Sequence, residues 1–188
     1  MLIVLLLMLG FPLFVILVLC AIYNGLVKLR NQCREAWSNV DTELKRRYDL
    51  IPNLVEVVKG YAKHEREVLA EVVRLRGVAL ASAGSPGSQA ADENQLVQGL
   101  RQLLAVAERY PDLKADRHYL ELQRELANTE DRIQAARRFF NGNVRDYRNA
   151  CESFPSNIIA GMFHFQPEEF FAVEPAVRTT VPDVGGTR

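Results

Sequence analysis

The chain opens with an unbroken run of apolar residues. Residues Leu2 to Ile22 carry no charged side chain. A helix of this length spans roughly 30 Å, which is the thickness of the hydrocarbon core of a bilayer. No Lys or Arg precedes the run, and no small-x-small cleavage pattern follows it, as a secretory signal would require. We therefore predict an uncleaved transmembrane anchor over residues 1–22.

Basic residues follow this anchor and none precedes it. Lys28, Arg30 and Arg34 lie within the distance over which flanking positive charge sets the topology of a membrane protein. We therefore expect a single-pass protein whose N-terminus lies outside and whose remaining residues lie in the cytoplasm.

Beyond the anchor, apolar residues recur at helical spacing from Leu26 to Val72, and we expect this helical run to continue to Ala81. Acidic and basic residues four positions apart, at 41 with 45 and at 43 with 47, favour ion pairs along its polar side. The basic triple at 45–47 is therefore interpreted as a solvated helix face.

Pro52 lies inside this run. Proline has no N–H, so the carbonyl of Tyr48 loses its helical donor, and the ring crowds the preceding turn. The helix could bend at this point, or Asp49 could cap a new helix with Pro52 in its first turn. We treat Asp49, Pro52 and Asn53 as a candidate hinge, and the alternative is a tolerated kink in a packed helix.

The remaining pattern is also helical. Residues 82–95 are small and polar and are predicted to form a surface loop, after which a short amphipathic helix ends near Pro111. From Tyr119 to Phe154, apolar residues repeat every seven positions, as in a helix that packs against other helices. The predicted fold is all-α: an antiparallel bundle of three to four long helices over residues 23–165, with the first helix kinked near Pro52.

Aromatic residues gather after this third helix. A short helix is predicted around Ser156 to Met162, and the rings near it could pad the bundle end, lie in the membrane interface or meet a partner. Residues 166–188 lack a core-forming pattern and are predicted to be a flexible extension unless assembly orders them. The candidate interface residues are Phe163, Phe165, Phe170 and Phe171.

Composition argues against catalysis and against nucleic-acid binding. The 23 basic residues balance the 23 acidic ones, so no global positive field attracts nucleic acid. The three cysteines are too scattered for a disulfide framework or a zinc site, and His64-Glu65 lacks the second histidine of a zinc protease motif, since position 68 is Val68. We expect no cofactor, no metal and no enzymatic activity.

Several long motifs resemble the bacterial LemA family. They are YNGLVKLRNQCREAWSNVDTELKRRYDLIPNLVEVVKGYAKHE at residues 23–65, LLAVAERYPDLKAD at 103–116, LQRELANTEDRI at 122–133 and FPSNIIAGMFHF at 154–165. The resemblance implies a single-pass inner-membrane protein with a soluble antiparallel helical bundle. It implies no catalytic residue, cofactor or substrate, and it links the chain to proteins associated with organising membrane compartments, including magnetosome membranes.

Two functions fit these features. The first is a membrane-anchored scaffold that acts on the lipid bilayer, self-associates as a homo-oligomer and organises or shapes the cytoplasmic membrane. The second is an adaptor that docks a membrane protease or signalling protein through its bundle or its C-terminal aromatic segment.

Overall fold

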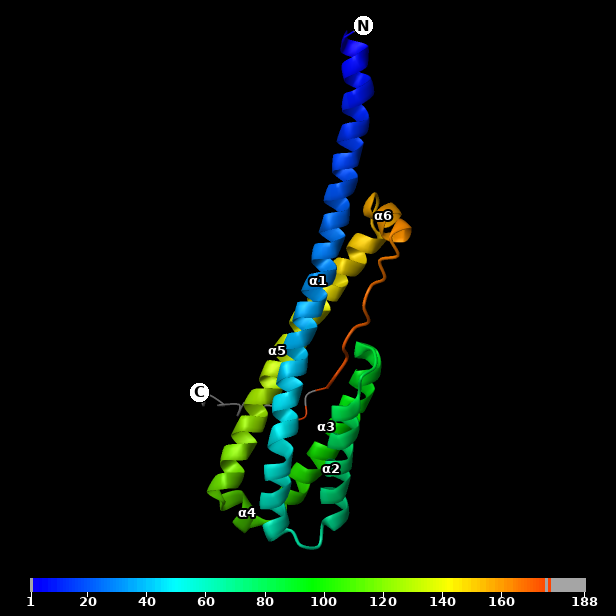
Figure 1. Cartoon of the computed structure of the whole chain (residues 1–188). Coiled ribbons are helices and arrows are strands. Elements are labelled where there is room, and N and C mark those ends of the chain that lie inside the picture. The colour runs from blue at the N-terminus through cyan, green and yellow to red at the C-terminus, as the bar shows by residue number, and fades with distance from the viewer. Residues whose placement is uncertain (1, 175, 177–188) are drawn as a thin grey trace, which may run out of the picture. The chain divides into compact units, whose positions relative to one another are not determined.

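The computed structural model describes residues 2–174 and 176, with side chains from residue 10 onward. The described residues form an all-α fold without strands (Figure 1). Its helices are α1 (Leu2–Tyr61), α2 (Arg66–Ala81), α3 (Pro86–Glu108), α4 (Pro111–Ala115), α5 (Arg117–Glu152) and α6 (Ser156–Met162). Two compact units divide the chain: an anchor unit of residues 1–38 and 138–170, and a bundle unit of residues 39–137 and 171–188.

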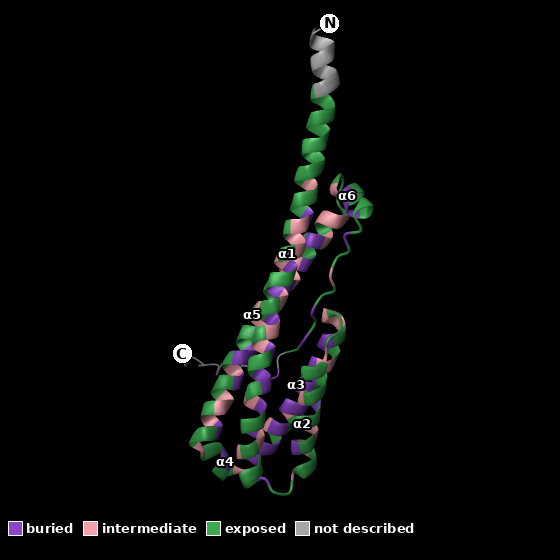
Figure 2. Cartoon of the chain, in the orientation of Figure 1, coloured by how far each residue is buried: buried purple, intermediate pink, exposed green. Residues whose placement is uncertain are grey.

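The apolar run forms the first part of α1 in the anchor unit. From Gly10 to Ala21 every side chain is exposed, so nothing in the described chain covers this stretch (Figure 2). By length and composition, α1 is the one helix among the described residues that could cross a membrane. Further along, Leu26, Cys33 and Ala36 are buried, at the helical spacing that the sequence predicts.

The core of the bundle unit is built from α1, α2, α3 and α5. Each helix contributes a stripe of buried aliphatic residues, because apolar side chains at a period of about 3.6 share one face. The approach of α2 to α3 is close at Gly99, where an added Cβ would lie 2.8 Å from Cδ1 of Leu75. The main aliphatic core residues are Val40, Leu44, Ile51, Leu54, Val58, Val72, Leu96, Leu100, Leu103, Leu126 and Ile133.

The predicted continuous run to Ala81 is wrong, because α1 ends at Tyr61 and the chain turns at residues 62–65 before α2. The turn is closed by the N–H of Glu65, which donates to the carbonyl of Ala62 at 3.2 Å. Ala62, the first residue of the turn, and Leu69, in the first turn of α2, are both buried. The apolar period therefore continues through the turn, and periodicity alone did not reveal the reversal.

The predicted loop at 82–95 is also wrong, because α3 begins at Pro86 and leaves only residues 82–85 outside a helix. Ser85 is the N-cap, and its hydroxyl accepts the N–H of Ser88 at 3.3 Å. A serine before a proline at the first helical position is a recognised helix start. Gln89 and Glu93, within the expected loop, are buried.

The predicted third helix is confirmed as α5. Asp116 caps it by accepting the N–H of Tyr119 at 2.9 Å. The seven-residue repeat is buried at Tyr119, Leu126, Ile133, Phe140 and Tyr147. The predicted last member, Phe154, follows the end of the helix and is 80% exposed, so the repeat stops with α5. The short helix predicted around Ser156 to Met162 is confirmed as α6.

Arg47 is buried in the bundle unit between two carboxylates. Its Nη1 donates to Oε1 of Glu130 at 2.9 Å, and its Nη2 donates to Glu93. The side chains of Arg47, Glu93 and Glu130 are 0%, 0% and 2% exposed. Because they come from α1, α3 and α5, one guanidinium group joins three helices, and the prediction that Arg47 faces solvent is wrong.

The electrostatics of this cluster are those of groups removed from water. Burial alone would lower the pKa of Arg47, but the two carboxylates outweigh it and raise that pKa. Burial raises the pKa of Glu93, although Arg47 and the hydroxyl of Tyr48, which donates to Glu93, both oppose this shift. Burial likewise raises the pKa of Tyr48. Each charge is therefore tolerated only because its partners are present.

An extended segment at residues 171–174, and Ala176 after it, pack into the bundle unit. Phe171, Val173 and Ala176 are buried. Asn94 clamps the backbone between them, since its Nδ2 donates to the carbonyl of residue 172 at 3.0 Å and its Oδ1 accepts the N–H of residue 174 at 2.9 Å. The N–H of Ala176 donates to Glu130 at 3.0 Å. The prediction of a flexible extension is therefore wrong for residues 171–174 and 176, and residues 175 and 177–188 lie outside the described residues.

Pro52 is accommodated inside α1, which continues through it without interruption. The alternative of a new helix capped by Asp49 is therefore wrong. The carbonyl of Tyr48, which Pro52 cannot serve, accepts a hydrogen bond of 2.6 Å from Nε of Arg76 on α2. The donor missing from the helix is thus supplied by its neighbour. The kink and the hinge function of Asp49, Pro52 and Asn53 stay predictions.

We expect Arg76→Met to lower the free energy of unfolding by about 1–3 kcal/mol, because the Tyr48 carbonyl loses its donor. In a Pro52→Ala background the restored N–H serves that carbonyl, so the same change should cost almost nothing. Chemical denaturation of the full chain in mild detergent, followed by circular dichroism, measures this cycle. Arg74→Met, at an exposed position on α2, is the control, and an equal cost of Arg76→Met in both backgrounds would contradict the assignment.

We expect Phe171→Ala to lower the free energy of unfolding by about 3–5 kcal/mol, since it empties a fully buried site. Its neighbour Phe170 is 40% exposed, so Phe170→Ala should cost about 1 kcal/mol or less. The same denaturation assay compares the two variants. Similar costs for both would show that segment 171–176 does not depend on Phe171 for its packing.

Candidate functional surfaces

Aromatic rings gather in the anchor unit where the apolar run of α1 ends. The Tyr23 ring meets Phe163 edge-on at 4.9 Å between centroids and Phe165 at 5.5 Å. On the next turns of α1, the Arg30 guanidinium lies 5.1 Å from the centroid of Phe165. Such edge-on and cation–π contacts add to the packing of the rings. They fasten the residues just after α6 to α1.

The four candidate interface residues divide into two classes. Phe163 and Phe170 are 54% and 40% exposed, whereas Phe165 and Phe171 are buried. Phe165 packs beneath Arg30, and Phe171 fills the bundle unit, so neither offers a surface to a partner. The Phe170 ring receives the Arg148 guanidinium at 4.8 Å. Only Phe163 and Phe170 remain available as the predicted interface.

The predicted membrane-flanking cations lie on α1 in the anchor unit. Lys28 and Arg34 are exposed, and Arg30 is half-buried against Phe165. Exposed cations beside an apolar span suit the headgroup region of a membrane, and a long basic side chain can pack its stem while its charge stays in water. Their role in topology stays a prediction.

A groove of about 770 Å³ lies between the end of α1 and the start of α2 in the bundle unit. Its apolar lining includes Val55, Leu69 and Val73, and no acidic side chain lines it. Among the described residues, none of its cations forms an ion pair with a carboxylate. The cations are Lys59, Lys63 and Arg66.

The exposed side of α2 extends this apolar lining. Val73 and Leu80, seven residues apart on the same side of the helix, are 49% and 52% exposed, whereas the exposed Val78 lies on another side. Gly77 lies between Val73 and Leu80 with open space around its Cα. Large exposed apolar side chains on one helix are a common feature of surfaces that other helices cover. The sequence did not reveal this surface, because all apolar residues of the predicted helical run from Leu26 to Ala81 were assigned to a single buried face.

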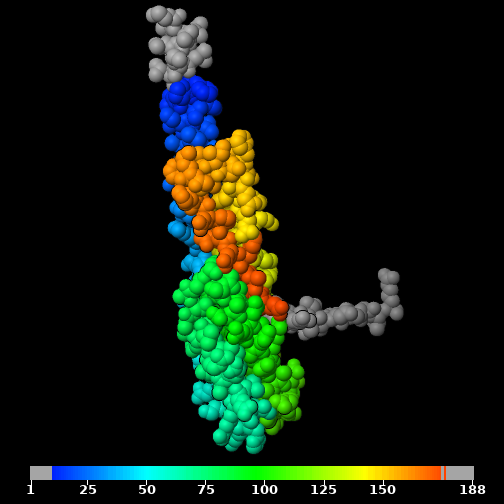
Figure 3. Space-filling model, turned by 90° about the vertical axis from the view of Figure 1, so that its right-hand side faces the viewer, coloured from blue at the N-terminus to red at the C-terminus, as the bar shows by residue number. Residues whose placement is uncertain are grey.

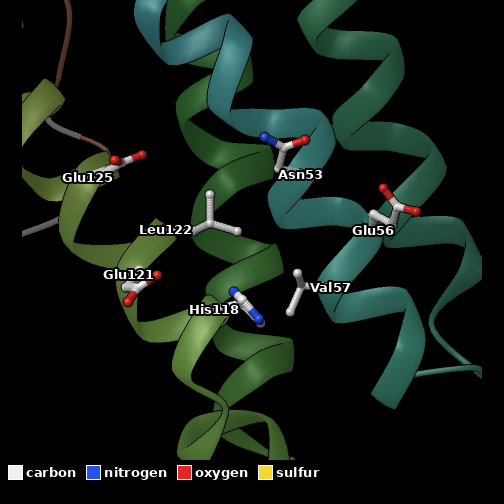
Figure 4. Close-up of a pocket in the computed structure, with 7 residues that line it drawn as sticks. All are labelled: Asn53, Glu56, Val57, His118, Glu121, Leu122 and Glu125. Atoms are coloured by element: carbon white, nitrogen blue, oxygen red, sulfur yellow. The ribbon is translucent and has the colours of Figure 1, made fainter.

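A second groove, of about 410 Å³, lies between α1 and α5 in the bundle unit (Figure 4). Asn53, Glu56 and Val57 line it from α1, facing the α5 residues His118, Glu121, Leu122 and Glu125. The carboxylates do not converge on a point in Figure 4. Within the described residues, no group of histidine, cysteine and acidic side chains has the arrangement of a metal site.

Cys33 and Cys151 lack the environment of a reactive thiol. Burial, with smaller contributions from Glu168 and Asp146, raises the pKa of Cys33 to about 11. Burial also raises the pKa of Cys151. A thiol that stays protonated at neutral pH is a poor nucleophile and a poor metal ligand. Cys33 is buried and packs as a small apolar residue.

Comparison with known proteins agrees with the sequence motifs. Magnetosome protein MamQ of Magnetospirillum gryphiswaldense is 25% identical over 186 residues, covering 85% of this chain and 68% of that protein. Magnetosome protein MamQ 2 of Paramagnetospirillum magneticum is 26% identical with the same coverage. Protein LemA of Metamycoplasma hominis is 27% identical over 138 residues, covering 73% of this chain and 63% of that protein.

The family model described as "LemA family" matches residues 36–185, which is most of the chain. The matched region contains α2 to α6 and the part of α1 beyond the aromatic cluster. The apolar anchor, the all-α fold and these matches agree, and the chain belongs to the LemA family.

Proposed function

We propose that this protein is a non-enzymatic, membrane-anchored scaffold that self-associates and organises or shapes the membrane to which it is anchored. The proposal is supported by the apolar start of α1, which leads into a helical domain without a break. It is also supported by relatives that are named as magnetosome proteins. A structural role of this kind needs no bound cofactor and no catalytic group.

The observation that carries self-association is the exposed apolar face of α2, formed by Val73 and Leu80 two turns apart and adjoining the groove at Val55 and Leu69. Covering these side chains removes apolar surface from water, which favours association by about 25 cal/mol for each Å² buried. In the proposed assembly, the occupant of this face is a helix of a second copy. Copies anchored in one membrane meet at high local concentration, so a modest interface is sufficient.

We further propose that the protein is a single-pass protein of the bacterial inner membrane with its helical domain in the cytoplasm. The cations Lys28, Arg30 and Arg34 follow the apolar run. Positive charge within about 15–20 residues of a span favours the cytoplasmic side.

A second candidate function is an adaptor for a membrane protease or signalling protein. The groove at the start of α2 favours it, because its apolar lining and its cations at Lys59, Lys63 and Arg66 match an amphipathic helix that carries carboxylates beside its apolar stripe. An adaptor of this kind forms a stoichiometric complex with its partner and self-associates little.

We expect the full-length protein in mild detergent to form a large particle of defined mass, measured by light scattering and imaged by electron microscopy. Val73→Asp combined with Leu80→Asp places charge on the α2 face and should shift the mass to smaller species. Asn128→Asp, at an exposed position on α5, adds a charge elsewhere and should leave the mass unchanged. A wild-type monomer at all concentrations would contradict the scaffold and favour the adaptor.

We expect a green fluorescent protein fused to the C-terminus to fluoresce in bacteria, and an alkaline phosphatase at the same position to be inactive. The reason is that the domain following the cations is retained in the cytoplasm. The reciprocal result, an active phosphatase with a dark fluorescent protein, would place the domain on the other side of the membrane.

A further inference from the structure

We propose that α6 is a second membrane contact: its exposed face lies in the headgroup region of the bilayer beside the anchor. The occupant of this face is a lipid surface. The inference rests on the proposed anchoring of α1. It gives the anchor unit a second membrane contact, which a single transmembrane helix does not require.

The position of α6 relative to the apolar run carries the first step. Tyr23 directly follows the last residue of the run, Ile22, and its ring lies 4.9 Å from that of Phe163 at the end of α6. When residues 2–22 span the hydrocarbon core, Tyr23 lies at its boundary, where tyrosine and tryptophan are enriched in membrane proteins. A ring in contact with Tyr23 lies at the same depth. Figure 3 shows α6 (orange) beside the point where the bare part of α1 begins.

The exposed face of α6 carries the second step. Phe154, Ile158 and Met162 follow one another at four-residue spacing and are 80%, 55% and 65% exposed. Phe163 adds a further exposed ring. Four large apolar side chains exposed on so short a segment are unfavourable in water. No other part of the described anchor unit covers them.

The absence of charge around α6 carries the third step. Residues 153–167 contain no Asp, Glu, Lys or Arg, although such residues make up 24% of the chain. A charged side chain is expensive to place at or below the headgroups, whereas Ser, Asn and His are tolerated at the interface. Two cations, Lys28 and Arg30, lie on α1 in the same unit, and Arg30 packs on Phe165. Cations in this position suit anionic headgroups.

The segment is held so that this face stays outward. The hydroxyl of Ser156 donates to the carbonyl of residue 150 at 2.6 Å, which ties α6 to the last turns of α5. Ile159 and Ala160 are buried on the inner side of the helix. The N–H of Phe165 donates to the carbonyl of Ala160 at 2.9 Å and closes the segment after α6. The apolar face is therefore presented by a fixed structure, as an interfacial helix requires.

Tryptophan fluorescence in vesicles tests the depth of α6. Trp37 is the only tryptophan of the chain, so the full-length Trp37→Phe protein serves as the background. Into it we place Met162→Trp on α6 or Phe139→Trp on α5; position 139 is 61% exposed and belongs to the same unit. Each protein is reconstituted into vesicles of phosphatidylcholine and phosphatidylglycerol with or without bromine on the upper acyl carbons. Circular dichroism verifies that each variant keeps its helix content.

We expect the Met162→Trp protein to lose about half of its fluorescence in the brominated vesicles, because interfacial helices bury their apolar face roughly 5–10 Å into the boundary between headgroups and acyl chains. The Phe139→Trp protein should lose almost none. A third variant, Phe14→Trp in the apolar run, reports the anchor itself and should also be quenched.

The three variants separate the failure of this inference from that of the anchor. Quenching of Phe14→Trp without quenching of Met162→Trp overturns the inference and leaves the anchor intact. A blue-shifted but unquenched Met162→Trp protein also overturns it, since the face is then covered by a second copy. If Phe14→Trp is not quenched, the result contradicts both the proposed anchor and the proposed interfacial contact.

Discussion

A guanidinium group held between two carboxylates in a dry interior organises the bundle unit. Arg47 reaches from α1 to Glu93 on α3 and to Glu130 on α5, and the second oxygen of Glu130 receives the N–H of Ala176. The attraction within such a cluster is offset by the loss of hydration, so its net contribution to stability is small. The main effect of the cluster is to destabilise alternative packings of the helices. Any packing that separates one member leaves a buried charge uncompensated, at a cost of about 3–5 kcal/mol. The three helices and the C-terminal segment must therefore find the same arrangement together.

The sequence predicts the elements that depend on local pattern and misses those that depend on distant partners. The helix over the apolar run, the start of α5 and its repeat from Tyr119 to Tyr147 follow from local pattern, and the structure has them. The pair of Asp41 with Lys45 forms at 2.7 Å, as its spacing predicts. The pair of Glu43 with Arg47 does not form: Glu43 lies 3.7 Å from Arg46 instead. Arg47 is drawn inward by Glu93 and Glu130, which are 46 and 83 residues away, and no local rule can detect such partners.

The candidate surfaces were predictable to different degrees. The composition of the aromatic segment after residue 153 indicated a site of interaction, but only the fold separates the exposed Phe163 from the buried Phe165. The α2 surface gave no sequence signal of its own, because its valines and leucines belong to the same apolar pattern as the core. The start of α3 was readable, since Ser85 followed by Pro86 is a helix start that outweighs the small, polar residues after it. Burial of Phe171, Val173 and Ala176 was not readable, because an extended segment without a period depends entirely on the side chains that receive it, above all Asn94.

The proline inside α1 has a consequence for alignment. Carbonyls in the middle of a long helix already accept an N–H from their own helix, so they have less need of a donor from a neighbouring helix. Pro52 frees the one at Tyr48, and Arg76 occupies it. Because Arg76 binds this carbonyl, α2 cannot shift along α1 by one turn without losing the hydrogen bond. Since both residues lie on one hairpin, the length of the turn at residues 62–65 is constrained even though its side chains are not. A residue usually regarded as a helix breaker thus sets the register in which two helices meet.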